Sequence, residues 1–302
     1  MNYIMRPVFN RPEMLYLSFE YEYKARETHK FSSDLTTLFI VEYGAPKSVV
    51  NMLNKYPYNY EIIFREYRYG LSANILEGFK TAFDKSNDFV IYIEDDVLLH
   101  SSYFQFMDAV LNHPEAKDFT VASAYYFNDN GSVNNLIRRN HYAALAPLIS
   151  KRFYNNYILP ISSMTYYKDP HGFVVALDGK YKDSDTYRYK SPMHNMQAGV
   201  INRLTDVATI EEGLTMVMPE VNRQQHIGFY GHNRPGGEII GNSFEERLEN
   251  LRDIITDPKK LYEATGSKQY NDYKIFSPKL ETWDGTLQLK KRKGDNSLMI
   301  DK

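Results

Sequence analysis

Residues 89–97 read FVIYIEDDV, an apolar and aromatic run that ends in three adjacent acids. A short run of this composition is typical of a buried strand, so Glu94, Asp95 and Asp96 are expected where the strand emerges at the edge of a sheet. Adjacent negative charges repel one another. A hard divalent cation, Mg²⁺ or Mn²⁺, offsets this repulsion because carboxylate oxygens suit it as ligands. Such a cation also holds diphosphate oxygens and stabilises a leaving nucleoside diphosphate. The alternative is a solvated strand end that caps the next helix.

Strand-like and helical segments alternate on both sides of this stretch. Strands are expected at residues 3–9, 37–43, 60–65, 88–93, 119–126 and 215–218. Helices are expected at residues 13–24, 48–56, 72–84, 193–205 and 244–255. The alternation predicts an α/β fold with a mostly parallel, Rossmann-like sheet flanked by helices. Ligands of such sheets bind at the carboxyl ends of the strands, where the acidic triplet lies.

The amino-acid composition excludes several classes of protein. The chain has 302 residues, a formal net charge of -2 and no cysteine, which excludes disulfides and thiolate-bound zinc. The balanced charge gives no general attraction to nucleic acid or to an anionic membrane. No leader-like start and no run of about 18 apolar residues is visible. We therefore expect a soluble protein with no membrane partner, in the cytoplasm of a bacterial cell or of a phage-infected host.

Several motifs together resemble a known family. Residues 65–69 (REYRY), the triplet at 94–96 and residues 128–131 (NDNG) are similar in kind and spacing to the donor-binding half of the N-acetylglucosaminyltransferase I family. Residues 219–223 (PEVNR) and 225–228 (QHIG) resemble that family's PEI-containing segment. They also resemble the NIGF-type segment of bacterial surface-polysaccharide transferases. The resemblance covers roughly residues 3–235.

The resemblance implies a GT-A fold and a metal-dependent transfer of a sugar from a nucleoside diphosphate to an acceptor hydroxyl. UDP is the favoured nucleotide. By position, Asp96 would bind Mn²⁺ or Mg²⁺, while Glu94 and Asp95 would contact the donor. We expect a catalytic domain over residues 1–242, with its donor half at 1–100 and its acceptor half at 101–242. Residues 243–302 are expected to form a helix and a polar tail.

Further donor contacts are expected at the ends of the first two strands. Asn10 and Arg11 stand where the family has an opening loop with an arginine against the uracil, and a guanidinium both stacks on bases and pairs with phosphate. The alternative is a simple helix start with Pro12 in its first turn. Glu42 ends the second strand, where an acid can accept a base N–H, although a lone glutamate there is often only solvated.

The third strand is followed by more donor candidates. Glu66 and Arg68 lie in the REYRY segment, and the family more often has histidine where Glu66 stands. Asn74 lies on the following helix, where its side chain can contact the ribose. The alternative at this helix start is a capping role for Ser72.

The catalytic base is harder to find. An inverting transfer, which we favour, needs a group that takes the proton from the acceptor hydroxyl. Related sequences place an acid ahead of the PE segment, but residues 191–199 (SPMHNMQAG) contain none. His194 is the candidate because a neutral imidazole accepts a proton near pH 7. A structural histidine is the alternative, and the possible substitutes are Asp183, Asp185, Asp206, Glu211 and Glu212.

A glycine-rich segment, HIGFYGHNRPGG at residues 226–237, resembles a loop that closes over the diphosphate and excludes water. By resemblance to the bacterial segment, His232 rather than His226 would complete the metal shell, and Arg234 would neutralise phosphate charge. The alternative is an ordinary glycine turn with exposed histidines.

The sequence leaves two classes of acceptor molecule open. A glycan or polysaccharide is implied by the resemblance, and the aromatic stretch 153–167 suits stacking on sugar rings. The alternative is DNA with 5-hydroxymethylated cytosine, as modified by phage glycosyltransferases, with phosphate contacts from Arg138, Arg139 and the run 290–293 (KKRK). A terminal charge run is also typical of a solvated tail. A third hypothesis is an inactive GT-A protein that only binds carbohydrate.

Overall fold

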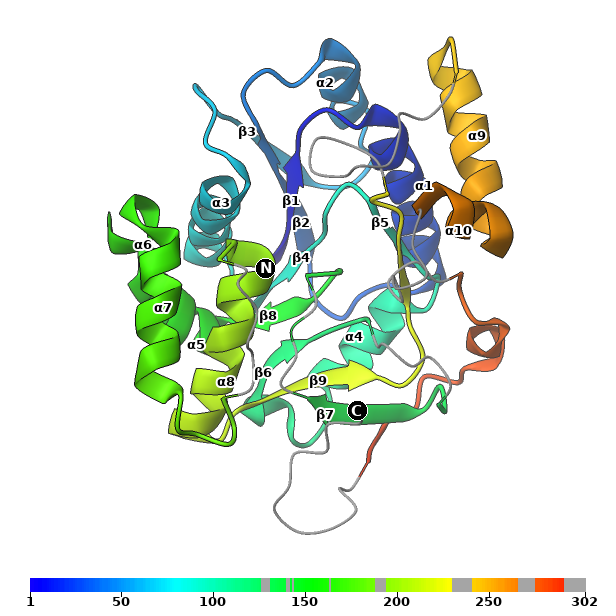
Figure 1. Cartoon of the computed structure of the whole chain (residues 1–302). Helices are drawn as coiled ribbons and strands as arrows, with labels where there is room; N and C mark the ends of the chain where they lie inside the picture. Colours follow the sequence, from blue (N-terminus) through cyan, green and yellow to red (C-terminus); the bar gives the residue numbers. More distant parts are fainter. Residues whose placement is uncertain are drawn as a thin grey trace.

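The computed structural model describes residues 1–125, 131–139, 142, 144–162, 164–187, 194–229, 241–265 and 275–290. Within these residues a nine-stranded sheet has the order β11-β7-β9-β6-β8-β4-β1-β2-β3, and β10 and β5 form a second, two-stranded sheet (Figure 1). The strands are β1 (Asn2–Val8), β2 (Leu35–Val41), β3 (Tyr60–Phe64), β4 (Phe89–Tyr92), β5 (Val97–Leu99), β6 (Phe119–Ala122), β7 (Asn135–Arg139), β8 (Leu148–Ser150), β9 (Thr215–Pro219), β10 (Gln224–His226) and β11 (Gln288–Leu289). The α-helices are α1 (Pro12–Thr28), α2 (Lys47–Leu53), α3 (Leu71–Lys85), α4 (Tyr103–Leu111), α5 (Lys151–Phe153), α6 (Met164–Lys168), α7 (Pro170–Tyr181), α8 (Ile201–Glu212), α9 (Phe244–Thr256) and α10 (Pro258–Thr265). Short 3₁₀ or π segments are η1 (Ala116–Asp118), η2 (Tyr154–Ile158), η3 (Leu159–Ser162), η4 (Met196–Val200) and η5 (Pro278–Thr282).

The central strands are buried on both faces. In β1, Tyr3 and Met5 belong to the apolar cluster under α3, whereas Ile4 belongs to the cluster around α4. Strands β2 and β4 divide their side chains between opposite faces in the same way, as the two-residue period of a strand requires. Helices cover both faces, so these strands are mostly apolar in sequence, apart from buried polar side chains such as Arg6 of β1. The expected α/β class, with a mostly parallel sheet flanked by helices, is confirmed.

The sheet also contains strands that run in the opposite direction. β8 lies between β4 and β6 and is antiparallel to both, and β7 is antiparallel to β9. It follows that β1, β2, β3, β4, β6 and β9 share one direction, and we call the side where they end the carboxyl edge. Helix α8 leads to the start of β9, which lies at the edge opposite the carboxyl edge. The helix ends at Gly213 in the left-handed conformation (φ 68°), which glycine adopts without a steric penalty.

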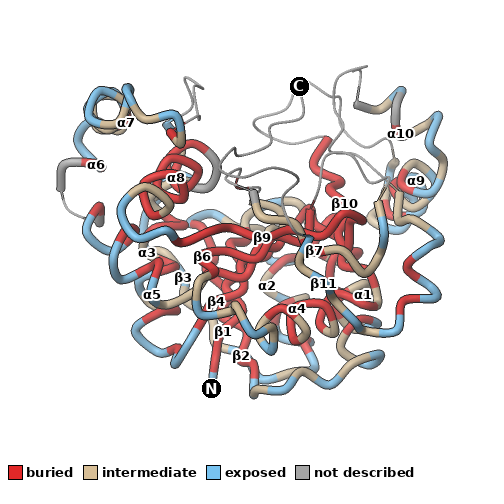
Figure 2. The backbone as a smooth tube through the Cα atoms, turned by 90° about the horizontal axis from the view of Figure 1, so that it is seen from below, coloured by how far each residue is buried: buried red, intermediate tan, exposed pale blue. Residues whose placement is uncertain are grey.

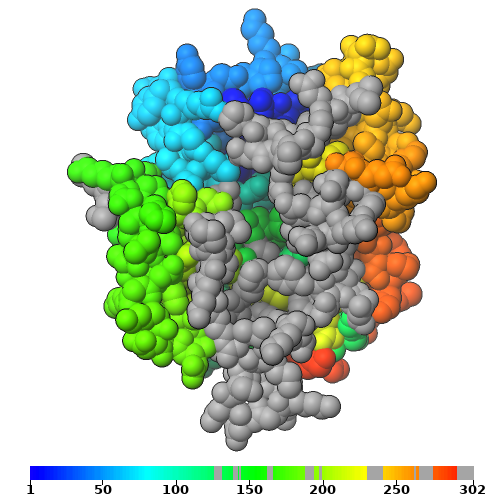
Figure 3. Space-filling view, in the orientation of Figure 1, coloured from blue at the N-terminus to red at the C-terminus, as the bar shows by residue number. Residues whose placement is uncertain are grey.

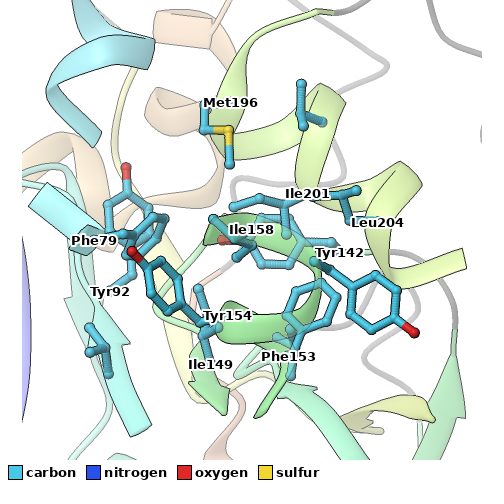
Figure 4. Close-up of a cluster of buried hydrophobic side chains, with 14 of the residues drawn as sticks. Phe79, Tyr92, Tyr142, Ile149, Phe153, Tyr154, Ile158, Met196, Ile201 and Leu204 are labelled. Atoms are coloured by element: carbon cyan, nitrogen blue, oxygen red, sulfur yellow. The ribbon is translucent and has the colours of Figure 1, made fainter. Parts of the chain in front are cut away.

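The aromatic stretch 153–167 is largely core, which makes the prediction of a sugar-stacking surface wrong for its buried members. Phe153, Tyr154 and Tyr166 are at most 1% exposed. Tyr154 stacks on Phe83 of α3 with ring centroids 4.0 Å apart. Figure 4 shows Phe153 and Tyr154 in the cluster that fills the space between the sheet, α3 and α8. These rings therefore stabilise the fold rather than present a face to a ligand.

The described segments after residue 242, residues 243–265 and 275–290, pack on the rest of the protein. Helix α9, expected at residues 244–255, is found at Phe244–Thr256 and buries Leu248, Leu251 and Ile255 against α1. Two ion pairs, Arg247 with Glu13 and Arg252 with Glu20, join the same helices. Farther along, β11 extends the main sheet beside β7, so the segment 275–290 is part of the packed structure.

Burial follows the sheet. In Figure 2 the strands form a buried band, while α7, α9 and α10 carry much of the exposed backbone. In the space-filling view of Figure 3, helices α6 to α8 (green) border one side of the visible face and α9 and α10 (orange) border the other. Among the described residues, no helix combines the length and apolar character that crossing a bilayer requires.

Candidate functional site

The acidic triplet forms the connection between β4 and β5 at the carboxyl edge. Asp95 and Asp96 are only 5% and 4% exposed, and Glu94 is half-buried. A solvated strand end would leave these carboxylates in water. Because the two aspartates are withdrawn from water instead, their charges need partners within the protein.

Arg11 supplies the first of these partners. It directly precedes Pro12, the first residue of α1, so the end of β1 delivers its side chain to the triplet. Its Nη1 donates to Asp96 Oδ2 at 2.7 Å, its Nε donates to Asp95 Oδ2 at 3.3 Å, and its Nη2 donates to Asp95 Oδ1. The expected donor-binding arginine therefore lies directly against the expected metal ligand.

His226 is the second partner, and strand pairing positions it. β10 pairs antiparallel with β5, which places His226 opposite Val97, next to Asp96. The Ile227 amide donates to the Asp96 carbonyl at 2.8 Å, which holds the end of β10 beside the acidic triplet. His226 Nε2 lies 3.4 Å from Asp96 Oδ2. The alternating direction of strand side chains sends Gln225 the other way, where its amide donates to the Ile255 carbonyl.

The glycine after this strand is required by close approach. A Cβ on Gly228 would lie 2.2 Å from Asp96 Oδ2 and 2.4 Å from His226 Nε2. Both distances are far below van der Waals contact, so any side chain at this position would push the carboxylate and the imidazole apart. The glycine signature of the QHIG segment is therefore explained by the Asp96–His226 contact.

Asp96 retains an unused oxygen. Its Oδ1 is buried and has no hydrogen-bond partner among the described residues, whereas Oδ2 faces Arg11 and His226. A buried carboxylate oxygen without a partner costs free energy unless a ligand occupies the position. Carboxylate oxygens suit Mn²⁺ and Mg²⁺, and His226 would add a nitrogen ligand. No three His, Asp or Glu side chains of the described residues form a complete metal cluster. Diphosphate oxygens and water would have to supply the remaining ligands.

The pKa values of the three acidic side chains shift in different directions. Burial works against the charge of Asp96, but Arg11 and His226 outweigh it and hold the carboxyl pKa of Asp96 well below its ordinary value. Burial raises the pKa of Asp95, with Arg11 opposing the rise. Burial, and then the charge of Asp96, raises the pKa of Glu94 to about 8, against a hydrogen bond from Tyr92. Of the three acids, Asp96 is the one whose pKa is lowered, which favours the charged form that a metal ligand needs.

Glu42 and Asn74 lie at the same edge and both have protein partners. Glu42 is 8% exposed and accepts hydrogen bonds from the backbone amides of Tyr43, Tyr69 and Gly70. It thereby ties the end of β2 to the start of α3. Asn74 Oδ1 accepts from Arg65 Nε at 2.8 Å. These contacts shape the carboxyl edge around the triplet.

Aromatic rings follow the end of β3. The rings of Tyr67 and Tyr69 stack with centroids 4.7 Å apart, and the Arg65 guanidinium lies 4.5 Å from the Tyr69 ring centroid. Arg68 is exposed, with its guanidinium 5.7 Å from the centroid of Phe9. Glu66 and Asn10 are also exposed near these strand ends. Sequence reasoning missed the ordered stack, although the RxYRY pattern of cations and aromatics carries its signal.

His194 lies on an exposed segment before η4. The Met196 amide donates to Ser72 Oγ at 3.1 Å, which places the segment beside the first turn of α3 at the carboxyl edge. Tyr166 holds the His194 carbonyl, and the His194 ring centroid is 6.1 Å from that of His171. Ser72 thus fixes the His194 segment. Gly70, not Ser72, is the N-cap residue of α3.

The substitute bases are placed less favourably. Glu211 and Glu212 end α8 on the side of the sheet away from the carboxyl edge. Asp206 is fully buried within α8, and Asp183 and Asp185 are exposed after α7.

Some of the remaining predicted residues have a described position, and the others lie outside the described residues. Arg138 pairs with Glu115, and Lys290 pairs with Glu220 at 2.6 Å. His232, Arg234, residues 128–130, residues 291–293 and the side chain of Arg139 lie outside the described residues.

Comparison with known proteins gives remote structural similarities. No protein-family description matches the chain, and no curated protein matches it in sequence. A structure of S. aureus TarS 1-349 in complex with UDP-GlcNAc matches 90% of this chain and 69% of its own, at 10% identity and TM-score 0.43. The galactosyltransferase LgtC, in complex with donor and acceptor sugar analogs, matches over 87% of this chain and 99% of its own, at 11% identity and TM-score 0.43.

A third similar structure is the mannosyltransferase PcManGT from Pyrobaculum calidifontis in complex with GDP-Man and Mn²⁺, at 12% identity and TM-score 0.35. That match covers 51% of this chain and 45% of the other. This chain therefore spans about half the length of that protein, and also about half of TarS 1-349 in a second structure. At identities of 12% or lower, these similarities assign no family.

Proposed function

We propose that the chain is a GT-A glycosyltransferase that transfers a sugar from a nucleoside diphosphate to an acceptor hydroxyl and requires Mn²⁺ or Mg²⁺. The favoured nucleotide is UDP. The observation that carries this proposal is Asp96: a buried carboxylate at the carboxyl edge, with one oxygen that has no partner among the described residues and with His226 beside the other. The sequence resemblance to sugar transferases falls on the same residues.

Roles follow from position. Asp96 and His226 would hold the cation, which when bound neutralises the charge that develops on the departing diphosphate. Glu94 and Asp95 lie beside them, where a donor sugar has to sit. Arg65, Arg68 and the Tyr67–Tyr69 stack follow β3 and offer cationic and aromatic contacts to a nucleotide. Glu42 and Asn74 support this surface through the loop that they anchor.

The test of this function is release of nucleoside diphosphate from a panel of UDP- and GDP-sugars, in Mn²⁺, in Mg²⁺ and in chelator. We expect slow hydrolysis of at least one donor with metal and none in chelator. Binding of donor with equal affinity in metal and in chelator would contradict the proposal. Binding of free glycans with no turnover of any nucleotide sugar would instead support a carbohydrate-binding protein.

We further propose His194 as the base that deprotonates the acceptor hydroxyl, in a transfer that inverts configuration. His194→Ala is expected to lower kcat by about 10²- to 10⁴-fold, the usual contribution of a positioned base. Donor affinity, measured by calorimetry with UDP and Mn²⁺, should stay unchanged. The matched control is His171→Ala, which removes the neighbouring exposed ring. Equal kcat in the wild type and His194→Ala would remove His194 from this role.

Gly228→Ala tests the geometry of the metal ligands without changing their chemistry. The added methyl group would meet Asp96 Oδ2 at 2.2 Å, so we expect Mn²⁺ affinity and turnover to fall about 100-fold. The control is Gly179→Ala on α7, where a Cβ meets nothing within 4 Å. Unchanged Mn²⁺ affinity in Gly228→Ala would show that Asp96 and His226 do not act together.

We propose a glycan as the acceptor. Of the basic residues considered for DNA, the described side chains of Arg138 and Lys290 are each in an ion pair with a glutamate. A gel shift at low salt with 5-hydroxymethylcytosine DNA and unmodified DNA, beside a glycan array, separates the two acceptors. A shift specific to the modified DNA would favour the phage-type activity.

A further inference from the structure

An arginine makes close charged contacts with the acidic triplet at the end of β4. Glu94, Asp95 and Asp96 are adjacent, and Arg11 contacts the two aspartates. The side chain of Arg11 is 22% exposed, whereas those of Asp95 and Asp96 are 6% exposed. The arginine thus reaches the acids from the solvent side.

Arg11 contacts Oδ2, the Asp96 oxygen beside His226; a cation that binds both His226 and Asp96 would use this oxygen, alone or together with Oδ1. Its Nη1 lies 2.7 Å from Asp96 Oδ2, the same atom that faces His226 Nε2 at 3.4 Å. A Mg²⁺ ion binds its oxygen ligands at about 2.0–2.1 Å. A guanidinium and a divalent cation on one oxygen would then lie only about 4 Å apart. Like charges at that distance repel strongly where little water screens them.

The contacts with Asp95 differ from the contact with Asp96. Asp95 receives two donors of Arg11, Nε and Nη2, in a bidentate arrangement that persists if the third contact is lost. Asp96 receives one. The side chain of Arg11 makes no capping hydrogen bond to α1, so a movement away from Asp96 leaves the helix start intact.

From these contacts we infer that Arg11 is a displaceable countercharge: it neutralises Asp96 when no donor is bound and yields this carboxylate to the divalent cation when the donor enters. The inference rests on the proposed function, because it requires a metal at Asp96. The diphosphate of the donor offers the released guanidinium a new anionic partner. Metal and nucleotide therefore bind cooperatively, and each raises the affinity for the other by the same factor.

The test measures binding of Mn²⁺ by electron paramagnetic resonance, with and without UDP, so that it does not depend on turnover. The wild type is expected to bind Mn²⁺ weakly alone and about tenfold or more tightly with UDP. Arg11→Gln should bind Mn²⁺ alone about tenfold tighter than the wild type and lose most of the effect of UDP. Arg11→Lys, which keeps the charge, should retain the wild-type pattern in weakened form.

The matched control is Arg247→Gln, which removes an arginine from a nearby ion pair with Glu13 on the first turn of α1. Its Mn²⁺ affinity should equal that of the wild type, which excludes a general effect of net charge. Weaker or equal Mn²⁺ binding in Arg11→Gln without UDP would overturn the inference. So would equal Mn²⁺ affinity of the wild type with and without UDP, a result that does not depend on any variant folding.

The same experiment separates this inference from the proposed function. If Mn²⁺ binds the wild type but not Asp96→Asn, the metal site stands, and only the comparison with Arg11→Gln decides the role of the arginine. If no form of the protein binds Mn²⁺ in the presence of UDP, both the inference and the metal-dependent function are wrong.

Discussion

Replacement of Asp96 by asparagine is expected to abolish metal-dependent turnover, with kcat lowered about 10³-fold or more. The change keeps the shape of the side chain but removes the charge. A neutral amide is a poor metal ligand, and it would replace a buried carboxylate oxygen that has no partner among the described residues. Arg11 also loses one of its two carboxylate partners. The measurements are release of nucleoside diphosphate and Mn²⁺ binding on the same preparation.

The control for this variant is Asp108→Asn. Asp108 is also buried and hydrogen-bonded, to His29 and Ser32, but it lies on α4 away from the carboxyl edge. We expect reduced thermal stability and near-normal kcat for Asp108→Asn. Substantial metal-stimulated turnover by Asp96→Asn, at more than a tenth of the wild-type rate, would show that the cation binds elsewhere.

Replacement of Glu22 by alanine is expected to destabilise the fold by about 3–5 kcal/mol, because it leaves buried cations without their counter-ion. Glu22 and Arg6 are fully buried and paired, and Glu22 also accepts from Arg26 Nε at 2.9 Å and from the Tyr56 hydroxyl. Arg6 lies on β1 and cannot reach water. Urea unfolding followed by circular dichroism measures the loss.

Glu20→Ala is the matched control on the same helix. Glu20 pairs with Arg252 at 2.8 Å on the surface, and both side chains are more than a third exposed. Exposed pairs of this kind contribute about 0–1 kcal/mol. A loss for Glu22→Ala as small as that for Glu20→Ala would mean that water or another acid reaches Arg6.

The acid dependence of the Glu22 contribution has a fixed sign. Burial raises the pKa of this carboxyl, but Arg26 and Arg6 outweigh burial and hold the pKa below its ordinary value of 4.5. The unfolded chain therefore takes up a proton at a higher pH than the folded protein does. The stabilisation is fully present above pH 4.5 and is lost as the pH falls below it.

The sequence predicted the first half of the fold well because its strands are buried on both faces. β1, β2 and β4 are mostly apolar, and helices with clear starts, such as Pro12 for α1, separate them. β7 and β8 were not predicted. β8 has three residues, and β7 contains two arginines. Their place in the sheet comes from pairing with strands far away in the chain.

The candidate site shows the same division. The acidic triplet and Arg11 follow predicted strands, so parallel topology alone brings their segments to one edge. The metal partner was expected at His232, which lies outside the described residues. The structure instead brings His226 to Asp96 through the pairing of β10 with β5. Both strands have three residues, and no sequence period announces strands so short.

The ladder between β5 and β10 also determines when the site is assembled during protein synthesis. Asp96 leaves the ribosome long before the residues that complete its surroundings, because His226 and Gly228 belong to the last third of the chain. Domains acquire distant contacts only once the later segment has been translated. A nascent chain that stops short of β10 thus contains the whole acidic motif and still lacks the imidazole beside it. The proposed metal site is therefore completed only after β10 has been translated.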